Sequence, residues 1–524
     1  MTLKALGDSA WLVEFPEKSG EAVLAQVMGL VDALEHQRPA GVWDVVPAFD
    51  SVAVHFAGDN GIRIREWLEA ATFTERLPAG EEREIAVCYG GECGPDLAEL
   101  ADQTGLSTAE VIALHCGATY TVAAVGFSPG FPYLLGLPER LWVPRRRTPR
   151  LSLPAGSVAV AGGQAGIYPV TSPGGWHVVG RTAVTLFDPH HARPAWLRTG
   201  DRVRFVPIEK WRSPVKLISP VSEPTGTIEV IQPGAATTVQ DLGRPGYESS
   251  GVSPGGAVDR HALRVANWLV GNDEGAAALE ICVSGPVLKF HEATVVAVMG
   301  KSRPVAAGES VDFSRLTTGV RAYLAVAGGL RVPVVLGSAA TDLRGGFGGV
   351  QGRALQAGDW LLTGEPRQAP RCGDWHVGRS ERVSTIELRF LAGVQHSWFS
   401  AEAQRRLRGE IYQLTPNSDR MGARLSGAEL HLTEAREMRS QPVASGSVQV
   451  PPDGQPIVLL AERQTIGGYP QIGHVISVDL PKLARAWPGT QVQFREVSWE
   501  QAQELRRLEE RDFKWLQTGL ELLK

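Results

Sequence analysis

Residues 126–181 read GFSPGFPYLLGLPERLWVPRRRTPRLSLPAGSVAVAGGQAGIYPVTSPGGWHVVGR, and this stretch decides the fold. It is dense in glycine and proline, it carries short apolar runs between the turns, and it has almost no acidic residues. Rigid turns that alternate with strand-like runs are typical of tightly wound β structure. We therefore predict a β unit that holds a fixed surface, and we expect function to reside there rather than on the surrounding helices.

The composition of the whole chain is that of an ordinary globular protein. Of the 524 residues, 43% are apolar and 21% are charged. The net charge of −5 differs from the positive net charge that is typical of nucleic-acid-binding domains. No apolar run reaches the length of a membrane span and the N-terminus lacks signal-peptide features, so we expect a cytoplasmic protein. The five cysteines are scattered without a paired motif, which favours isolated thiols over a zinc site or disulfides.

Periodicity and turn signals divide the chain into four folded units, a linker and a terminal helix. In chain order the expected segments are 1–82, 83–210, a linker at 211–226, 227–378, 379–497 and a helix at 498–524. The first unit has the order strand, helix, strand, strand, helix, and a strand at Glu84–Cys88 would complete a ferredoxin-like arrangement. Ser107 with Glu110, and Ser498 with Gln501, are capping-box signatures that mark two helix starts.

An internal repeat links the two halves of the chain. Gly156–Pro169 reads GSVAVAGGQAGIYP, and Gly446–Pro470 contains GSVQV followed by QTIGGYP. Further on, TGDRVRF at Thr199–Phe205 is echoed by PGTQVQF at Pro488–Phe494. The spacing of about 290 residues is too large for a solenoid. The repeat therefore predicts that two lobes share one fold through domain duplication.

Three Ser-Pro-Gly steps, at Ser128, Ser172 and Ser253, predict rigid turns. The first lies in a match to the G-x-S-x-G nucleophile pattern, but Pro129 has no backbone N–H to give to an oxyanion, so we interpret it as a turn. Glycine-rich turns expose N–H groups that can bind a carboxylate. The chain has no complete phosphate-loop motif, no metal-ligand spacing and no biotin-attachment lysine motif.

Polar side chains gather near these turns. A basic run within PRRRTPR is either a solvated face or an anion clamp, because arginine binds carboxylates and phosphates in a bidentate manner. Other polar residues, framed by glycine, are either turn caps or the lining of a binding cleft. The candidate substrate- and anion-binding residues are Arg145, Arg146, Arg150, Gln164, Tyr168, Arg181, Gln240, Arg244, Asp419, Arg420, Arg424, Gln464 and Tyr469. Asp241 and Glu462 are the candidate general bases, and the sequence does not choose between them.

Long motifs in the first half resemble the KipI family, also called allophanate hydrolase subunit 1 or the B subunit of 5-oxoprolinase. They are GFSPGFPYLLGLP, PRRRTPR, PAGSVAVAGGQAGIYP and SPGGWHVVGRT. Motifs in the second half resemble the KipA family, also called allophanate hydrolase subunit 2 or the C subunit of 5-oxoprolinase. They include PGAATTVQDLGRPG, GVSPGGAVD, SDRMGARL and QTIGGYP. The resemblance covers nearly the whole chain and identifies it as similar to a KipI–KipA fusion.

This resemblance implies a mainly β fold with α+β parts. A small ferredoxin-like α+β N-terminal domain would precede cyclophilin-like β-barrel lobes, one in the first half and two in the second. It also implies the fused B/C component of an ATP-dependent 5-oxoprolinase, which opens 5-oxoproline to glutamate. Its partner would be a separate protein like the A subunit of 5-oxoprolinase, with Mg-ATP as a shared substrate, a small-molecule amide as the other substrate and no covalent biotin in this chain. Nucleic acid and membrane are not expected as partners, and a homo-oligomer is left open.

Two alternatives follow from the same resemblance. The two modules also form the carboxyltransferase region of urea carboxylase, so a carboxyltransferase-type component of a biotin-dependent urea or amide carboxylase is the second hypothesis. KipI-like and KipA-like proteins regulate a sensor histidine kinase, so a kinase inhibitor and antagonist in one chain is the third.

For every enzymatic hypothesis we expect a cleft between lobes. Arg145, Gln164 and Tyr168 would lie on one side of this cleft. Asp241, Arg420 and Gln464 would lie on the other.

Overall fold

The structure, a computed structural model, describes residues 1–15, 20–58, 60–75, 80–210, 226–315, 319–372, 376–377, 383–436 and 438–522. The predicted linker at 211–226 lies outside these ranges, except for Gly226.

The N-terminal unit is a four-stranded antiparallel sheet with two helices. In sheet order its strands are β1 (Thr2–Ala5), β2 (Ala10–Glu14), β4 (Ser51–Phe56) and β3 (Val42–Ala48), and its helices are α1 (Glu21–His36) and α2 (Gly61–Ala70). The predicted order of strand, helix, strand, strand, helix is confirmed. The strand expected at Glu84–Cys88 belongs instead to the neighbouring barrel as part of β5 (Glu82–Tyr89), because it pairs in parallel with β13 (Arg202–Ile208). The short strand β1 occupies the edge of the sheet in its place.

Both faces of this sheet are covered. Trp11, Val13 and Val54 face α1 and α2 and form a core with them. Leu12 and Ala53 point to the other face, where they share a core with residues of both barrels. Successive residues of a strand point to opposite faces, so a sheet buried on both sides needs the continuous apolar runs seen in β2 and β4.

Two closed seven-stranded barrels contain most of the remaining strands. Around the first ring the order is β5, β12 (His177–Arg181), β9 (Ser157–Ala161), β10 (Gln164–Ile167), β7 (Pro132–Leu135), β6 (Thr119–Val125) and β13. Around the second it is β24 (Thr385–Ala392), β31 (Gln471–Val475), β28 (Ser447–Gln449), β29 (Ile457–Leu459), β26 (Gly422–Ser426), β25 (Tyr412–Leu414) and β32 (Gln491–Glu496). The two rings have the same connectivity, and in each the first and last strands pair in parallel. Domain duplication is therefore confirmed.

One part of the sequence repeat is out of register with this duplication. The GSV segments begin the equivalent strands β9 and β28, and the two RVRF-like segments are the equivalent strands β13 and β32. However, the QAGI segment of the first barrel is β10, whereas QTIGGYP contains β30 (Ile466–Gly467), which pairs with β27 (Gln441–Pro442). Its counterpart in the first barrel is β11 (Ser172–Gly174), which pairs with β8 (Arg150–Leu153). The similar turn sequences GIYP and GGYP therefore occur at two different places in the ring.

The lobe at residues 226–363 consists of two five-stranded sheets packed face to face. In sheet order the first contains β20 (Ser310–Asp312), β17 (Val287–Phe290), β14 (Ile228–Gln232), β23 (Trp360–Thr363) and β22 (Leu330–Arg331). The second contains β15 (Ala236–Gln240), β16 (Ala278–Cys282), β21 (Arg321–Val326), β18 (Thr294–Val298) and β19 (Lys301–Val305). One apolar core lies between the two sheets. The predicted three β lobes are thus present, with closed rings in two of them.

The other helices cover the lobes. They are α3 (Leu97–Thr104) and α4 (Thr108–Gly117) on the first barrel, α5 (Arg260–Leu269) on the two-sheet lobe, α6 (Ala401–Gly409) and α7 (Leu480–Arg485) on the second barrel, and α8 (Trp499–Leu522). Both predicted capping boxes are confirmed, at the starts of α4 and α8. No helix in the described ranges is long and apolar enough to cross a membrane.

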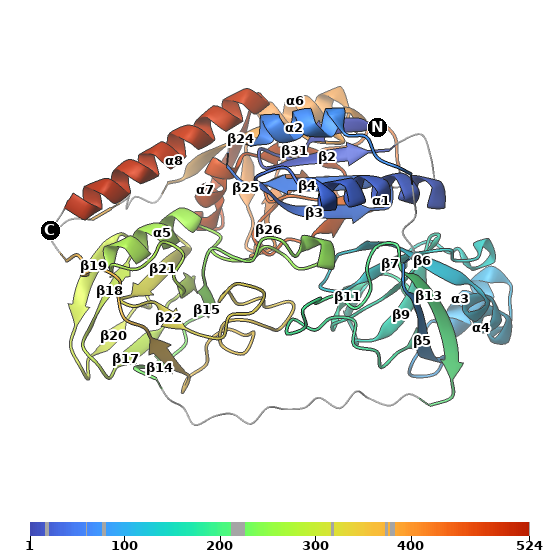
Figure 1. Ribbon diagram of the computed structural model, residues 1–524, viewed down its shortest axis with the longest axis horizontal. Helices are drawn as coiled ribbons and strands as arrows, with labels where there is room; N and C mark the ends of the chain where they lie inside the picture. The colour runs from blue at the N-terminus through green and yellow to red at the C-terminus, as the bar shows by residue number, and fades with distance from the viewer. Residues whose placement is uncertain are drawn as a thin grey trace.

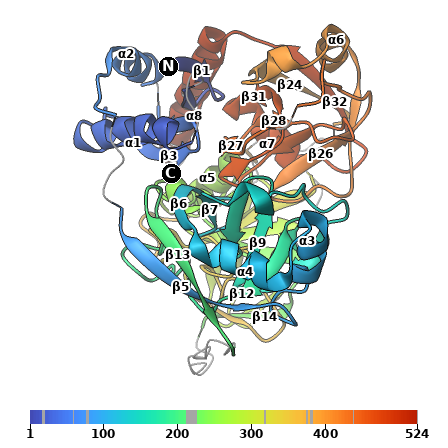
Figure 2. The same cartoon turned by 90° about the vertical axis from the view of Figure 1, so that its right-hand side faces the viewer.

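Figure 1 shows how these units are arranged. The N-terminal sheet and the second barrel lie side by side, and the first barrel and the two-sheet lobe lie together below them, an arrangement that Figure 2 shows from the side. Helix α8 runs from the N-terminal sheet, where Trp499 stacks 5.2 Å from Trp11, to the two-sheet lobe, where Phe513 lies 4.6 Å from His261. It ties together two parts of the chain, near Trp11 and His261, that are 250 residues apart in the sequence.

Candidate functional site

Turns from both halves of the chain meet at one place, which we call the central junction and define as residues 126–131, 250–256, 342–349 and 461–468. The amide of Gly130 donates to the carbonyl of Ser250 (2.9 Å), and the amide of Gly255 donates to the carbonyl of Ala461 (3.1 Å). A Cβ at Gly126 would lie 2.6 Å from the side chain of Ile466, so only glycine fits there. Two of the three predicted Ser-Pro-Gly turns, those at Ser128 and Ser253, therefore contact the same junction.

The first barrel contributes an aromatic cluster to the central junction. The rings of Phe127 and Tyr168 both pack edge-on against Phe131, and the ring centroid of Tyr133 lies 4.9 Å from that of Phe131. Burial raises the pKa of Tyr133 and of Tyr168, so both phenols stay protonated and can donate hydrogen bonds. Gln164 begins the strand β10 that carries Gly166, the partner of Tyr133 across the ladder.

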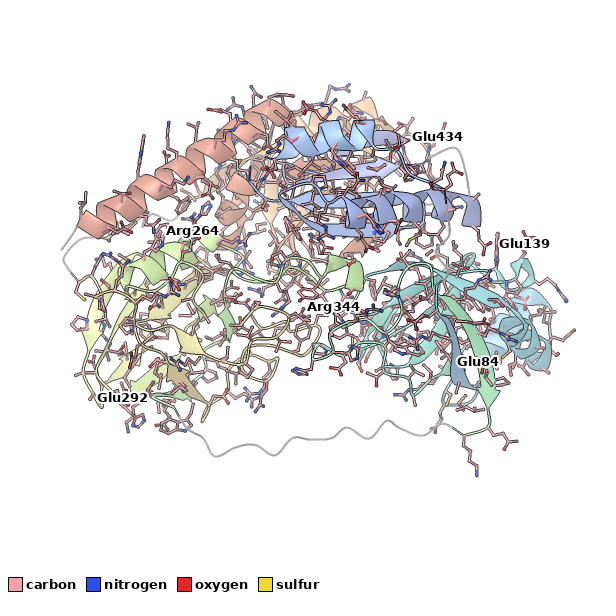
Figure 3. The ribbon with its side chains drawn as sticks, in the orientation of Figure 1. Glu84, Glu139, Arg264, Glu292, Arg344 and Glu434 are labelled. Atoms are coloured by element: carbon pink, nitrogen blue, oxygen red, sulfur yellow. The ribbon has the colours of Figure 1, made fainter. Side chains whose placement is uncertain are left out.

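Two arginines approach this cluster, one from each half of the chain. Arg344 lies in the loop after Asp342, and its guanidinium carbon is 4.5 Å from the centroid of Phe127 (Figure 3). Arg145, which is exposed, comes from the basic run of the first barrel and lies near Gly468 of the second barrel. Both positive charges act on the hydroxyl of Tyr133.

A buried ion network connects the second barrel to the two-sheet lobe at the central junction. Arg420 donates from Nε to Glu462 (2.7 Å), from Nη1 to Glu280 and from Nη2 to the carbonyl of Gly256 (2.7 Å). Arg420 and Arg321 hold the pKa of Glu280 below its usual value although burial opposes this. Burial, helped by the charges of Asp342 and Glu280, raises the pKa of Glu462 although Arg420 opposes this. Glu462 is thus a buried carboxyl whose Oε2 accepts no hydrogen bond from any described residue.

The other predicted base, Asp241, is fully engaged. Its two oxygens accept from the amide of Gly243, the hydroxyl of Ser338 and the amide of Ala339, each at 2.7 Å. These bonds hold two loops of the two-sheet lobe together. Of the two candidates, Glu462 is therefore the one with an oxygen left for chemistry.

The neighbours of Asp241 in the QDLGR segment are buried rather than exposed to a cleft. Gln240 donates to Thr238 and to the carbonyl of Thr341. Arg244 donates to the carbonyl of Ala340, and its guanidinium stacks 4.9 Å from the centroid of Phe347. Burial lowers the pKa of Arg244. Both side chains support the loops that form the central junction.

Several predicted residues are committed elsewhere. Arg146 and Arg150 both bind the buried Asp96, and Arg150 does so with two hydrogen bonds of 2.6 Å. Burial would raise the pKa of Asp96, but the hydrogen bond from Arg150 and the charges of both arginines hold it below its usual value. Thus two of the arginines of the predicted anion clamp form a structural ion network, because Asp96, 50 residues before Arg146, binds both and Glu99 also binds Arg146.

The last five predicted residues lie at or beyond the rim of the central junction. Arg181 donates from Nε to the carbonyl of Ala155, and Arg424 is exposed on β26. Asp419 is also exposed and caps the amides of the next turn. In the QTIGGYP turn, the side chain of Gln464 points at Gly467 and that of Tyr469 is exposed.

A second buried charge cluster was not predicted. Arg463 of the second barrel donates from Nη2 to Glu248 (2.7 Å), which lies in the two-sheet half in the 3-10 turn η2 (Glu248–Ser250). The amide of Glu248 donates to Asp44 (2.6 Å), and the ring of His55 lies beside the same carboxylate; both belong to the N-terminal sheet. Three units of the chain share this cluster, and no local sequence pattern marks it.

Arg344 was also missed, although a signal for it existed. It stands in RGGFGG, where Gly346, Gly348 and Gly349 all have positive φ. Such a loop can bring its backbone close to other chains while one long side chain projects from it. An arginine framed by glycines in this way is a better candidate for binding a ligand than one within a run of arginines.

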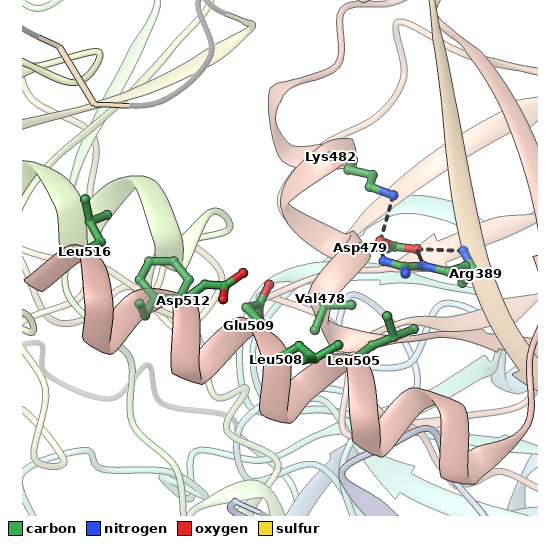
Figure 4. A pocket seen from close by; sticks show the side chains of 10 residues that line it. Arg389, Val478, Asp479, Lys482, Leu505, Leu508, Glu509, Asp512 and Leu516 are labelled. Carbon is green, nitrogen blue, oxygen red and sulfur yellow. Dashed lines mark hydrogen bonds and ion pairs between the residues drawn. The ribbon is translucent and has the colours of Figure 1, made fainter.

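Away from the central junction, a groove of about 410 Å³ lies under α8 (Figure 4). Apolar side chains such as Leu505, Leu508 and Leu516 line it, beside Asp479 with its partners Arg389 and Lys482. In the part of the chain that the structure describes, no group of three or more His, Cys, Asp or Glu side chains is placed to hold a metal ion.

Comparison with known proteins identifies the class. The family described as carboxyltransferase domain, subdomain C and D, matches residues 1–197, and carboxyltransferase domain, subdomain A and B, matches residues 250–496. The B subunit of 5-oxoprolinase from Bacillus subtilis (strain 168) is 39% identical over 232 residues, which are 40% of this chain and 93% of the relative. The C subunit of 5-oxoprolinase from Escherichia coli (strain K12) is 38% identical over 304 residues, which are 55% of this chain and 97% of the relative.

Solved structures give the same result. The crystal structure of TTHA0988 has a TM-score of 0.81 and 35% identity, over 94% of this chain and 100% of that one. The urea carboxylase of Kluyveromyces lactis has a TM-score of 0.52 and 27% identity, over 56% of this chain and 29% of that one. The chain therefore belongs to the carboxyltransferase-domain family, with a part similar to the B subunit of 5-oxoprolinase followed by a part similar to the C subunit. The names of these relatives give no support to the kinase-regulator alternative.

Proposed function

We propose that this chain is the fused B and C component of an ATP-dependent 5-oxoprolinase, which opens 5-oxoproline to glutamate together with a separate protein like the A subunit. One observation carries the proposal. Parts that are separate subunits in the relatives are joined in one chain here, and polar residues of both parts meet at the central junction. The chain has no complete phosphate-loop motif, so we assign most of the ATP binding to the partner.

The overall reaction converts 5-oxoproline, ATP and water to glutamate, ADP and phosphate. A lactam carbonyl is unreactive, and transfer of a phosphoryl group to its oxygen makes it open to attack by water. The ring C–N bond then breaks, the nitrogen takes a proton as it leaves, and an acyl phosphate remains. A second water hydrolyses this acyl phosphate to the carboxylate of glutamate and inorganic phosphate. Such a sequence needs a base for the water and hydrogen-bond donors for the developing oxyanion. We assign the base to Glu462, because its Oε2 is unused and burial raises its pKa toward neutral pH.

The test is glutamate release from 5-oxoproline by the purified chain with its cognate A-subunit-like protein and ATP. We expect ATP-dependent release, and we expect Glu462→Gln to lower kcat about 100-fold or more. Asp419→Asn is the matched control, because Asp419 is an exposed carboxylate beside Arg420 but outside the central junction and should leave the rate within about twofold. Absence of glutamate from the wild-type chain with partner and ATP present would overturn the proposal.

The family match and the likeness to a urea carboxylase favour one second candidate, a carboxyltransferase-type component of a biotin-dependent carboxylase. In that case biotin would reside on another protein. Capture of a biotinylated partner from a lysate, with bicarbonate consumed in an ATP-dependent reaction and no glutamate formed, would replace the first proposal with this one.

A further inference from the structure

We propose that Arg344 and Arg145 form an anion clamp at the central junction, which holds the carboxylate of a small, flat amide substrate against the aromatic cluster of Phe127, Tyr133 and Tyr168. The choice of a carboxylate-bearing amide rests on the proposed function. The clamp itself is inferred from the contacts and charges of the described residues.

Arg344 has hydrogen-bonding capacity that the protein does not use. Its guanidinium stacks on Phe127 at 4.5 Å, yet it forms no hydrogen bond or ion pair with any described residue. Its side chain is half-buried. Burial lowers the pKa of its guanidinium, although the charges of Asp342, Asp419 and Glu462 oppose this. A guanidinium stacked on a ring presents its N–H groups at the edge of its plane, which is the geometry for binding a carboxylate with two hydrogen bonds.

Arg145 supplies the second charge from a fixed loop. Its neighbours Arg146 and Arg150 are anchored to Asp96, so the loop is held at two points. Arg145 itself has no hydrogen bond or ion pair within the described ranges, and across the junction a Cβ added at Gly468 would be 3.9 Å from its Nη2. The charge of Arg145 acts on the hydroxyls of both Tyr133 and Tyr168.

The carboxylates around Arg344 form their hydrogen bonds with other groups, and only their charges act on its guanidinium. Glu462 is bound by Arg420, and Asp342 accepts the amide of Gly345 at 2.7 Å and lies 3.9 Å from Arg244. Asp419 accepts the amides of the turn that follows it. None of these three carboxylates forms a hydrogen bond with Arg344. The guanidinium groups of Arg344 and Arg145 can therefore bind an external anion.

The surroundings favour a flat carboxylate over a phosphate. The clamp rests on aromatic rings rather than on a row of backbone amides, and a planar amide ring gains stacking area there. The phenol of Tyr133 supplies a further hydrogen-bond donor near both arginines. Because one arginine comes from each half of the chain, binding of the anion also links the B-like part to the C-like part.

The experiment measures equilibrium binding by calorimetry without ATP or partner. The ligands are 5-oxoproline, its neutral analogue 2-pyrrolidinone, which lacks the carboxylate, and inorganic phosphate. We expect Arg344→Gln and Arg145→Gln each to weaken 5-oxoproline binding about tenfold or more and to abolish the preference over 2-pyrrolidinone. Arg147→Gln is the matched control, because Arg147 is an exposed arginine of the same basic run. It should bind 5-oxoproline like the wild type, and thermal unfolding checks that all variants fold.

Three results would overturn the clamp: wild-type affinity in both variants, equal affinity of the wild type for 2-pyrrolidinone and 5-oxoproline, or no measurable binding to the wild type. Competition by phosphate that is lost in Arg344→Gln would reject the carboxylate and assign the site to phosphate. The outcome is separate from that of the proposed function. Binding that depends on the clamp, without glutamate release, would reject the 5-oxoprolinase proposal and leave the clamp in place.

Discussion

Asp44 and His55 are buried beside Glu248, and the protein shifts their pKa values in opposite ways. Burial, helped by the charge of Glu248, raises the pKa of Asp44 to about 7. Burial lowers the pKa of His55 to about 4, so its imidazole is neutral at neutral pH and its contact with Glu248 at 3.7 Å is not an ion pair. Both groups therefore link folding to pH over nearly the same range.

Between about pH 4 and pH 7 the folded state keeps the proton of Asp44, whereas the unfolded chain releases it. Stability from this group falls as pH rises, by about 1.4 kcal/mol per unit. For His55 the unfolded chain binds the proton between about pH 4 and 6.5, so its contribution rises with pH. We predict that the unfolding free energy of Asp44→Asn, minus that of the wild type, increases with pH in this window. The same quantity for His55→Gln should decrease with pH. Denaturant unfolding at several pH values tests this, and parallel pH profiles for both variants and the wild type would contradict it.

At this scale the sequence predicted which kinds of residue form the candidate site better than it predicted their partners. Arg145, Tyr168, Arg420, Glu462 and Gln464 were all named and lie at or near the central junction. The roles of Arg146 and Arg150 depend on Asp96, a residue that only the folded barrel brings near. The partner of an arginine is a long-range property, and a run of arginines alone does not specify it.

Among the elements, α8 does the most to connect distant parts. Gln503 donates to the carbonyl of Asp8 (2.7 Å) at one end of the helix. Toward its other end Phe513 packs against His261 and Trp268, with the guanidinium of Arg264 stacked 4.5 Å from its centroid. The groove in Figure 4 lies between these two attachment points.

We predict that Phe513→Ala loosens α8 by about 2 kcal/mol, because it removes a partly buried ring with aromatic and cationic neighbours. Trp515→Ala is the control on the same helix, since Trp515 is 64% exposed, and it should cost less than about 1 kcal/mol. Hydrogen exchange of the amides of α8 measures both, with roughly 30-fold faster exchange expected for the first variant. Equal exchange in the two variants would show that the ring contacts do not hold the helix.

Sequence patterns predicted most elements and misplaced a few, for physical reasons. In β9 the alternation of Val158 and Val160 with Ala159 and Ala161 indicates a strand buried on two sides, and the structure places the valines inside the barrel. The pattern of β5 is equally strand-like, but nothing in it says which sheet it joins. Strand partners are chosen by tertiary packing, which is why β5 was assigned to the wrong sheet and QTIGGYP was matched to the wrong turn.

For the whole molecule, described residues of the two halves contact each other directly. The N-terminal sheet meets the second barrel through Asp8, which accepts from the hydroxyl of Ser477 at 2.7 Å, and through Glu14, which accepts from Gln441 at 3.1 Å. An apolar core that contains Leu12, Tyr133 and Ile466 spans the N-terminal sheet and both barrels. The related B and C subunits exist as separate chains, which agrees with a self-sufficient interface.

We predict that the halves stay together when the chain is cut. A specific protease site placed between residues 210 and 226 should be cleaved without separating the fragments, so both should elute together on size exclusion. Elution as two species at micromolar concentration would contradict the prediction. Asp8→Ala is the sensitised variant, because it removes the acceptor for Ser477 and should raise the concentration needed for co-elution.

The parallel pairing of the first and last strand in each barrel constrains when each barrel can fold as the chain leaves the ribosome. The first ring cannot close until β13 has emerged, and the second cannot close until β32 has, because each of these strands completes a pair that began over a hundred residues earlier. The N-terminal sheet is complete by Phe56. One of its apolar faces packs partly against Val394, Ala444 and Ile466, which are synthesised much later. The first barrel covers part of this face once it has closed, and the rest stays uncovered in a nascent chain until the second barrel is made.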